Sequence, residues 1–218
     1  MLAWPATAFF GVALAYLSAA PGLLGKRHDG SFKSTHLLIL LPYFVAVWGK
    51  WWLKNRLTSE AVWNEVVPGL YVGRWPAAGQ VPKSAQLVVD LAAEFPRAAS
   101  IGNARQYVSL PTLDYETPAV ADLVTVAGRV AQGRANTYVH CAMGHGRSAF
   151  VVAAILLRRG VARDAPEALS LLKAARPGIG LSRSQRALLQ QLEPSLVAPG
   201  HHGRDPLLHE PRPRDSFP

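Results

Sequence analysis

The feature that most constrains the fold is the stretch from Thr137 to Ser148, which holds the only cysteine of the chain. Its first four residues are mostly β-branched or aromatic, and they predict a buried strand. A loop with two glycines follows, and the apolar run that begins at Ser148 predicts a buried helix. The stretch is therefore interpreted as a strand, a tight loop and the N-terminus of a helix.

Such a loop turns successive backbone N–H groups inward, above the positive end of the helix dipole, and so forms a site for a phosphate dianion. The same field stabilises the thiolate of Cys141, which is the reactive form. Arg147 adds a planar guanidinium that can hold two phosphoryl oxygens at once. Glycines give backbone freedom where a side chain would crowd the anion or prevent a positive φ. The predicted phosphate-binding loop consists of Ala142, Met143, Gly144, His145, Gly146 and Arg147.

A less specific interpretation is that Cys141 is a buried small hydrophobic residue and that Arg147 is an ordinary cation. However, the macrodipole disfavours a cation near the start of a helix, so a functional role explains the arginine better. A nucleotide-binding P-loop is excluded because no Gly-Lys-Ser/Thr follows the glycines.

The motif His-Cys-x-x-Gly-x-x-Arg-Ser, from His140 to Ser148, resembles the signature loop of the cysteine-dependent protein tyrosine phosphatase superfamily. The resemblance covers roughly residues 60 to 194 and is strongest to the compact dual-specificity branch. It implies a phosphoric monoester hydrolase that forms a phosphocysteine intermediate and needs no metal or cofactor. The same loop and the stretch from Leu110 to Tyr115 are also similar to mitochondrial-type phosphatidylglycerophosphate phosphatases.

The resemblance implies a role for each conserved position of the motif that is present here. Cys141 would be the nucleophile, and Ser148 would donate a hydrogen bond to its thiolate. His140 would support the loop by hydrogen bonding. In the family, the general acid is an aspartate on the loop before the helix that precedes the cysteine strand. Asp114 occupies that place, and Glu116 is the alternative.

Three further polar residues receive structural interpretations. Asp90 and Glu94 are interpreted as supports of strand ends, and Gln185 as the glutamine of a capping box that begins at Ser182. Glu116 and Thr117 are well placed to cap a helix, whereas Asp114 lies too far upstream for that role.

The periodicity of the remaining catalytic region predicts strands that alternate with helices, which is typical of a mostly parallel sheet covered by helices. We therefore expect an α/β fold in which such a central sheet is flanked by helices. The predicted strands are 66–67, 70–73, 86–91 and 106–110, in addition to 137–140, and the predicted helices after the first quarter are 118–132, 148–157, 164–175 and 182–193.

The formal net charge of +9 is unevenly distributed. Residues 1–56 carry six Lys and Arg residues against one Asp, whereas residues 57–194 carry fourteen against ten acidic residues. Because more than half of the excess lies in the apolar N-terminal quarter, we interpret it as membrane-flanking charge and not as a nucleic-acid site.

That N-terminal quarter predicts two transmembrane helices, at about residues 2–25 and 34–53, joined by a turn from Lys26 to Gly30 into a hairpin. A cleaved signal peptide is the alternative, but no basic segment precedes the first apolar run. The basic residues do not indicate which side of the membrane each end of the hairpin faces. Three of them lie between the two predicted helices, and three lie at or just after the end of the second one. A catalytic thiolate persists best in a reducing compartment, so we expect an integral membrane protein, of the inner membrane in a bacterium, with its catalytic domain on the cytoplasmic side.

The predicted organisation is thus a membrane hairpin over residues 1–56, a dual-specificity-type phosphatase domain over 57–194, and a disordered tail over 195–218 that is rich in Pro and His. The expected partners are a membrane and a phosphorylated substrate, which is either a phosphoprotein, a phospholipid head group or a small phosphate ester. The alternative function is a catalytically inactive phosphate-binding module tethered to the membrane. Metal binding by His201, His202 and His209 is disfavoured, because no acidic or cysteine partner lies at a fixed spacing.

Overall fold

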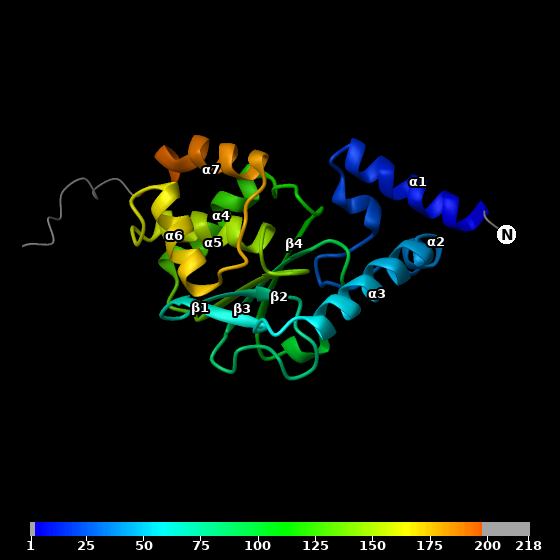
Figure 1. Ribbon diagram of the computed structural model, residues 1–218, viewed down its shortest axis with the longest axis horizontal. Coiled ribbons are helices and arrows are strands. Elements are labelled where there is room, and N and C mark those ends of the chain that lie inside the picture. Colours follow the sequence, from blue (N-terminus) through cyan, green and yellow to red (C-terminus); the bar gives the residue numbers. More distant parts are fainter. Residues whose placement is uncertain (1–2, 198–218) are drawn as a thin grey trace, which may run out of the picture.

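The computed structural model describes residues 3–197, and its centre is a five-stranded sheet with the strand order β1-β2-β5-β3-β4 (Figure 1). β1 pairs with β2 antiparallel, and the other three pairings are parallel, so the predicted mostly parallel sheet is confirmed. The strands are β1 (Trp63–Val67), β2 (Leu70–Arg74), β3 (Leu87–Ala92), β4 (Gln106–Thr112) and β5 (Thr137–Cys141).

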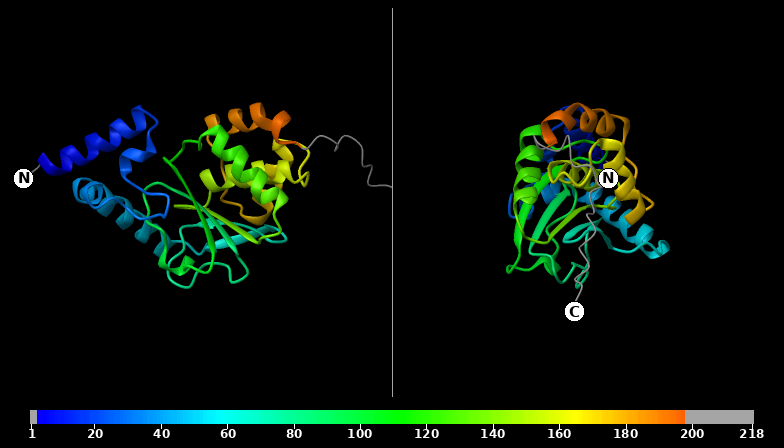
Figure 2. Two further views of the ribbon diagram at one scale, coloured as in Figure 1. Left: turned by 180° about the vertical axis from the view of Figure 1, so that it is seen from behind. Right: turned by 90° about the vertical axis from the view of Figure 1, so that its left-hand side faces the viewer.

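Four helices pack over one face of this sheet (Figures 1 and 2). They are α4 (Val120–Gln132), α5 (Arg147–Arg158), α6 (Ala165–Ala175) and α7 (Arg183–Leu196). α5 lies in the middle and contacts the other three, and it is buried along nearly its whole length. The opposite face is covered by the two connections that join β2 to β3 and β3 to β4. The second connection includes the short helix η2 (Ala99–Ile101).

The central strands are apolar on both faces because both faces are covered. In β5, Val139 and Cys141 belong to the core under the helices, whereas Tyr138 belongs to the core on the other face. This alternation is the period of two that a strand imposes on its side chains. Cys141 is the last residue of β5, so the strand delivers the thiol to one end of the sheet.

The boundaries of the four helices α4 to α7 follow the predictions closely, with one difference in capping. α4 begins at Val120, two residues after Pro118, and its N-cap residue Ala119 makes no side-chain capping bond. The expected caps from Glu116 and Thr117 are therefore not used at this helix start.

The two predicted caps of the last helices are present. Asp164 accepts a hydrogen bond from the backbone N–H of Glu167, and Ser182 and Gln185 form the predicted capping box. α7 continues to Leu196, so the predicted start of the tail at residue 195 is slightly too early. The rest of the predicted tail, with its three histidines, lies outside the described residues.

The N-terminal quarter departs most from its prediction, because both predicted helices are interrupted. In place of one helix over 2–25 there are α1 (Ala3–Leu17) and a short helix η1 (Pro21–Leu24), and in place of 34–53 there are α2 (Ser34–Ile39) and α3 (Leu41–Leu57). Pro21 and Pro42 explain the breaks, since proline lacks an N–H and clashes with the carbonyl of the preceding helical turn. None of the helices between residues 3 and 197 combines the length and the apolar composition that crossing a membrane requires.

The N-terminal segment packs directly against the catalytic region. Residues of α1 and α3 share a hydrophobic cluster with Ala93 and Leu113, which follow β3 and β4. Lys26, which the sequence placed in a membrane-flanking turn, is buried instead, and its Nζ lies 2.7 Å from Asp90 Oδ2. Burial alone would raise the pKa of Asp90, but the charge of Lys26 holds that pKa below its usual value. An ion pair thus joins the N-terminal segment to β3.

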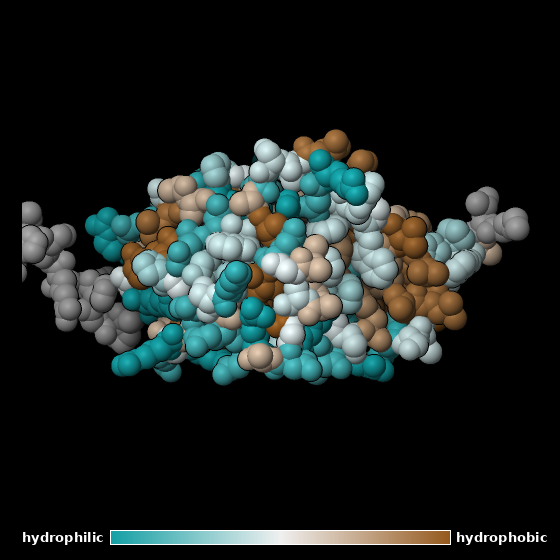
Figure 3. All heavy atoms as spheres, turned by 90° about the horizontal axis from the view of Figure 1, so that it is seen from below, coloured by the Kyte–Doolittle hydropathy of each residue, from teal (hydrophilic) through white to brown (hydrophobic). Residues whose placement is uncertain are grey.

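Large apolar side chains remain exposed mainly on this N-terminal segment. Of the sixteen that are exposed among residues 3–197, thirteen lie between Trp4 and Leu57. Figure 3 shows apolar residues gathered at the end of the molecule that the N-terminal helices form. We call the surface formed by these exposed apolar side chains between Trp4 and Leu57 the apolar end.

Candidate active site

The loop from Cys141 to Arg147 joins β5 to α5 and surrounds the thiol with polar hydrogens. The backbone N–H of Gly144 lies 3.2 Å from Cys141 Sγ, and Ser148 Oγ lies 3.4 Å from it. The thiol is nearly buried, at 3% exposure, and Ser148 is fully buried. The loop therefore presents the sulfur as an acceptor of hydrogen bonds, which suits a thiolate.

Of the two loop glycines, only Gly144 has a backbone φ that favours glycine. Gly144 has φ +78°, and a Cβ there would collide with the backbone of Gly73 and Arg74 in β2. Gly146 has φ −107°, and a Cβ there would make only ordinary contacts. A positive φ is therefore confirmed for Gly144, whereas the angle of Gly146 is one that other residues also adopt.

Arg147 begins α5 and is held by a pair of parallel hydrogen bonds to one carboxylate. Its Nη1 and Nη2 donate to the two oxygens of Glu94 at 2.8 and 2.6 Å, and Nη1 also donates to the carbonyl of Thr112 at 2.8 Å. Nε is buried and has no hydrogen-bond partner within residues 3–197. Burial alone would lower the pKa of Arg147, but Glu94 raises it well above its usual value. The arginine is thus a fixed cation.

Of the two candidate acids, the structure brings only Asp114 to the thiol. Asp114 Oδ1 lies 3.2 Å from Arg147 Nη2, and its side chain is 56% exposed. It lines the same cavity as Cys141 and Arg147, whereas Glu116 lines a different cavity beside α4. The intervening Tyr115 has φ +65°, which turns the chain between the two carboxylates. The geometry therefore favours Asp114.

His140 is fully buried directly before the thiol, and its ring stacks on Tyr138. Its two ring nitrogens have no hydrogen-bond partner in the described part of the chain, and Nδ1 lies 3.8 Å from Asp90 Oδ1. The expected hydrogen bond from His140 to the loop is therefore not made. Burial lowers the pKa of His140 below its usual value although Asp90 opposes the shift, so the ring is neutral at pH 7.

A second ion-pair network supports the far side of the loop. His145 Nε2 lies 2.8 Å from Glu60 Oε2, and the same oxygen forms an ion pair with Arg176 Nη2 at 2.8 Å. Arg176 is buried and also donates to the carbonyl of Met143 at 3.3 Å. The loop is thus attached to the segment that follows α3.

Sequence reasoning missed two contributions to this site. Glu94 was interpreted as support of a strand end, although a carboxylate within an apolar run is a signal that it has a buried partner. Trp48 and Trp51 lie in the segment 34–53 that was interpreted as the second transmembrane helix. Instead their indole N–H groups donate to the carbonyls of Glu94 and Ala142, each at 2.9 Å. α3 therefore contacts both active-site loops.

The cavity at the thiol has a volume of about 550 Å³, and walls from both parts of the chain surround it. Besides the residues named above, the N-terminal helices contribute Tyr16, Tyr43, Val47, Lys50, Trp51 and Lys54. A volume of this size holds a ligand much larger than a phosphate group.

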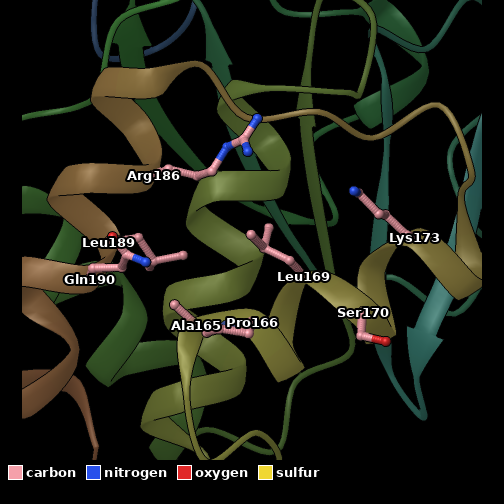
Figure 4. A pocket seen from close by; sticks show the side chains of 8 residues that line it. All are labelled: Ala165, Pro166, Leu169, Ser170, Lys173, Arg186, Leu189 and Gln190. Atoms are coloured by element: carbon pink, nitrogen blue, oxygen red, sulfur yellow. The ribbon is translucent and has the colours of Figure 1, made fainter.

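A second groove, of about 410 Å³, lies between α6 and α7, as Figure 4 shows. Its lining contains Leu169, Lys173, Arg186 and Leu189, but no thiol, imidazole or carboxylate from the described residues. It contains Ser170 and Lys173, but neither has a histidine, cysteine or carboxylate beside it in this lining to activate it. The chemistry therefore belongs to the cavity at Cys141.

Comparisons with known proteins agree with this geometry. The family model of the dual specificity phosphatase catalytic domain matches residues 70–194. Among solved structures, PTPMT1 is similar at 20% identity and a TM-score of 0.53, over 62% of this chain and 95% of that chain. Human DUSP28 is similar at 22% identity and a TM-score of 0.53, over 63% and 96%. Tk-PTP in its active form is similar at 26% identity and a TM-score of 0.53, over 61% and 97%. No curated protein matches the chain.

Proposed function

The chain belongs to the family of dual-specificity phosphatase catalytic domains and is therefore a phosphoric monoester hydrolase, and we propose that it acts through a phosphocysteine intermediate on Cys141. The observation that carries this proposal is the loop geometry. The sulfur accepts the Gly144 N–H, contacts Ser148, and shares one cavity with the buried Arg147. The proposed reaction uses protein side chains alone.

In the first half of the reaction, the Cys141 thiolate attacks phosphorus, and the S–P bond forms as the P–O bond to the leaving alcohol breaks. The loop N–H groups and the free Nε of Arg147 hold the phosphoryl oxygens while their charge develops. Glu94 fixes the orientation of Arg147, because its two oxygens accept hydrogen bonds from Nη1 and Nη2 of the guanidinium. The phosphoryl group therefore meets donors that are already in place.

Asp114 supplies the proton in the first half and removes one in the second. As an acid it protonates the leaving oxygen, so that an alcohol departs instead of an alkoxide. As a base it then takes a proton from the water that attacks the phosphocysteine, which releases inorganic phosphate. The sulfur leaves as a thiolate, and the hydrogen bond from Ser148 stabilises it.

Replacing Asp114 with asparagine is expected to lower kcat on alkyl phosphates by about 10²-fold or more, because their leaving groups need a proton. Aryl phosphates with good leaving groups should lose much less. Rates measured over a series of leaving groups check this expectation. Glu116→Gln is the matched control, since Glu116 lies in another cavity. The assignment is wrong if the Glu116 variant shows the leaving-group dependence and the Asp114 variant does not.

For the substrate, we propose a phospholipid that carries a phosphate monoester. The support is that the cavity has apolar walls from Tyr16, Tyr43 and Val47, which belong to the helices of the apolar end. A solved structure of PTPMT1 is a complex with PI(5)P, and it is similar to this chain at a TM-score of 0.55 and 20% identity, over 62% of this chain and 96% of that chain. A phospholipid is thus bound by a protein of similar fold.

We propose that the apolar end binds the membrane that holds this lipid. Phe10 and Leu17 are 72% and 87% exposed there, and contiguous exposed apolar surface of this kind marks contact with a partner or a lipid surface. The apolar end adjoins the cavity through Tyr16, so a bound bilayer would lie next to the thiol. We place the catalytic region on the cytoplasmic side, where a reducing environment preserves the thiolate.

The test compares three substrates with the full-length protein: phosphatidylglycerophosphate in vesicles, a phosphotyrosine peptide and a soluble aryl phosphate. We expect the lipid to be the best substrate. The double variant Phe10→Ser with Leu17→Ser should lower vesicle binding and lipid turnover by about 10-fold or more, since each exposed apolar side chain gains free energy on burial. Its rate on the aryl phosphate should stay at the wild-type value.

Val161→Ser is the matched control, because Val161 is exposed but lies beyond α5, away from the apolar end. Turnover of phosphotyrosine peptides with none on the lipid would overturn the lipid proposal and establish a protein phosphatase. Equal vesicle binding by the double variant and the wild type would overturn the membrane role of the apolar end.

A further inference from the structure

α3 turns one face toward the active-site cavity along much of its length. Tyr43, Val47, Lys50, Trp51 and Lys54 all line the cavity that holds Cys141. Tyr43, Val47, Lys50 and Lys54 are spaced by three or four residues, as on a single helix face, and Trp51 lies beside Lys50. The first part of this face is apolar or aromatic, and the last part carries two lysines.

The position of these lysines relative to the phosphate-binding loop is fixed by Trp51. The indole N–H of Trp51 donates to the carbonyl of Ala142, the residue after the nucleophile, at 2.9 Å. The same ring packs against Trp75 and Phe95, with ring centroids 5.2 and 5.5 Å away. Lys50 precedes Trp51 and Lys54 follows it by three residues, so both lie within one helical turn of a direct contact with the loop.

The charges that face the cavity show why these lysines matter. Arg147 is matched by Glu94 in a two-bond pair and also contacts Asp114, so two carboxylates surround one guanidinium. Neither Lys50 nor Lys54 forms an ion pair with the described part of the chain. The unmatched positive charge on the cavity wall is therefore theirs.

Two lysines at positions i and i+4 repel each other on an isolated helix. An anion between them removes that repulsion, and the phosphoryl group that reacts at Cys141 already has the loop N–H groups and Arg147 as its partners. The cavity of about 550 Å³ leaves room for a further group beside that phosphoryl group. A second anion on the same substrate molecule fits these conditions.

We propose that Lys50 and Lys54 form a subsite for a second phosphate of the substrate, a phosphodiester, next to the phosphate monoester that Cys141 attacks. This inference rests on the proposed function and narrows its substrate class. The preferred substrate carries one phosphate monoester and one phosphodiester. Its apolar part continues along Val47 and Tyr43 toward the apolar end. The subsite lies on α3, outside the region that matches the phosphatase family model.

The test uses two soluble compounds in which the same kind of oxygen leaves, a primary hydroxyl of glycerol: glycerol 3-phosphate and glycerophosphoglycerol phosphate. The second compound adds a phosphodiester and no acyl chain. We expect wild-type kcat/KM to be at least about 10-fold higher for the second compound, because a charged hydrogen bond contributes a factor of this size. In the double variant Lys50→Gln with Lys54→Gln, the ratio between the two compounds should fall by about 10-fold, mainly through KM.

Arg56→Gln is the matched control, because Arg56 lies on the same helix but stacks on Trp52 and does not line the cavity. The ratio should be unchanged in this variant. The same pair of compounds is then titrated against the Cys141→Ser protein, so that binding is measured without turnover. The lysine substitutions should lower the affinity for the phosphodiester compound selectively in that background too.

The outcomes separate the subsite from the function on which it rests. Equal affinity of the Cys141→Ser protein for both compounds, or a preference that survives the loss of both lysines, would overturn the subsite. Selective binding of the phosphodiester compound that depends on the lysines would support it, whatever the rate. Absence of hydrolysis of both compounds and of an aryl phosphate by the wild type would instead contradict the proposed function.

Discussion

Replacing Cys141 with serine is expected to lower kcat by at least about 10⁴-fold on every phosphate monoester, because a hydroxyl is far less ionised than a thiol and is a weaker nucleophile. The fold should be retained. A serine oxygen is smaller than sulfur, and the Gly144 N–H and Ser148 hydroxyl around it remain available as partners. Turnover measured on an aryl phosphate, together with the unfolding temperature, checks both parts.

A binding measurement separates loss of chemistry from loss of the site. The Cys141→Ser protein should bind inorganic phosphate with an affinity similar to that of the wild type, since Arg147 and the loop N–H groups are unchanged. Rapid quenching of the wild type with substrate should trap a phosphorylated cysteine, and the variant should show none. A serine variant that turns over within about 10-fold of the wild type would exclude the cysteine mechanism.

Replacing Arg147 with lysine is expected to lower kcat/KM by about 10³-fold, the second largest effect. Lysine keeps the charge but has a single ammonium, which cannot donate to both oxygens of Glu94 and to a phosphoryl group in one fixed plane. Both hydrogen bonds to Glu94, at 2.6 and 2.8 Å, depend on the planar fork. Steady-state kinetics on an aryl phosphate and phosphate affinity provide the readout.

Glu94→Gln is the matched comparison, because it leaves the guanidinium in place, removes the charge of its partner and keeps one of the two acceptor oxygens. We expect a smaller loss, about 10-fold, with weaker phosphate binding as its cause, since Glu94 acts through the orientation of Arg147. If the Arg147→Lys protein instead has the kinetics of the wild type, the bidentate role of the arginine is wrong. If Glu94→Gln lowers only the unfolding temperature, Glu94 is a structural partner and does not position Arg147 for the reaction.

The resemblance of His140 to Ser148 to the phosphatase signature loop was confirmed by the family match. This part was predictable because a strand, a loop and a helix N-terminus are local structures, and the residues proposed to bind phosphate lie within twelve positions of one another. The mostly parallel sheet was predictable for a related reason. Its central strands are covered on both faces, so they are mostly apolar and are easily recognised.

The placement of Asp114 was an inference from family position, and the structure brings its carboxylate to Arg147. The sequence could not choose between Asp114 and Glu116 by spacing alone. The left-handed conformation of Tyr115 directs the two carboxylates into different cavities, and a non-glycine residue adopts that conformation only where the surrounding fold holds it. The choice therefore depends on tertiary structure.

The sequence alone predicted the loop, its cysteine and arginine, and the sheet that carries them. The tertiary structure was needed to show that Glu94 holds Arg147 and that α3 forms a wall of the same cavity. Glu94 and Arg147 are 53 residues apart, and Trp51 and Ala142 are 91 residues apart. Side-chain periodicity reports which residues are buried but not which distant segment buries them. The tryptophans and lysines of α3 have the composition of a membrane border, and their contacts exist only because the N-terminal segment packs on the catalytic region, through the cluster with Ala93 and Leu113 and the ion pair of Lys26 with Asp90.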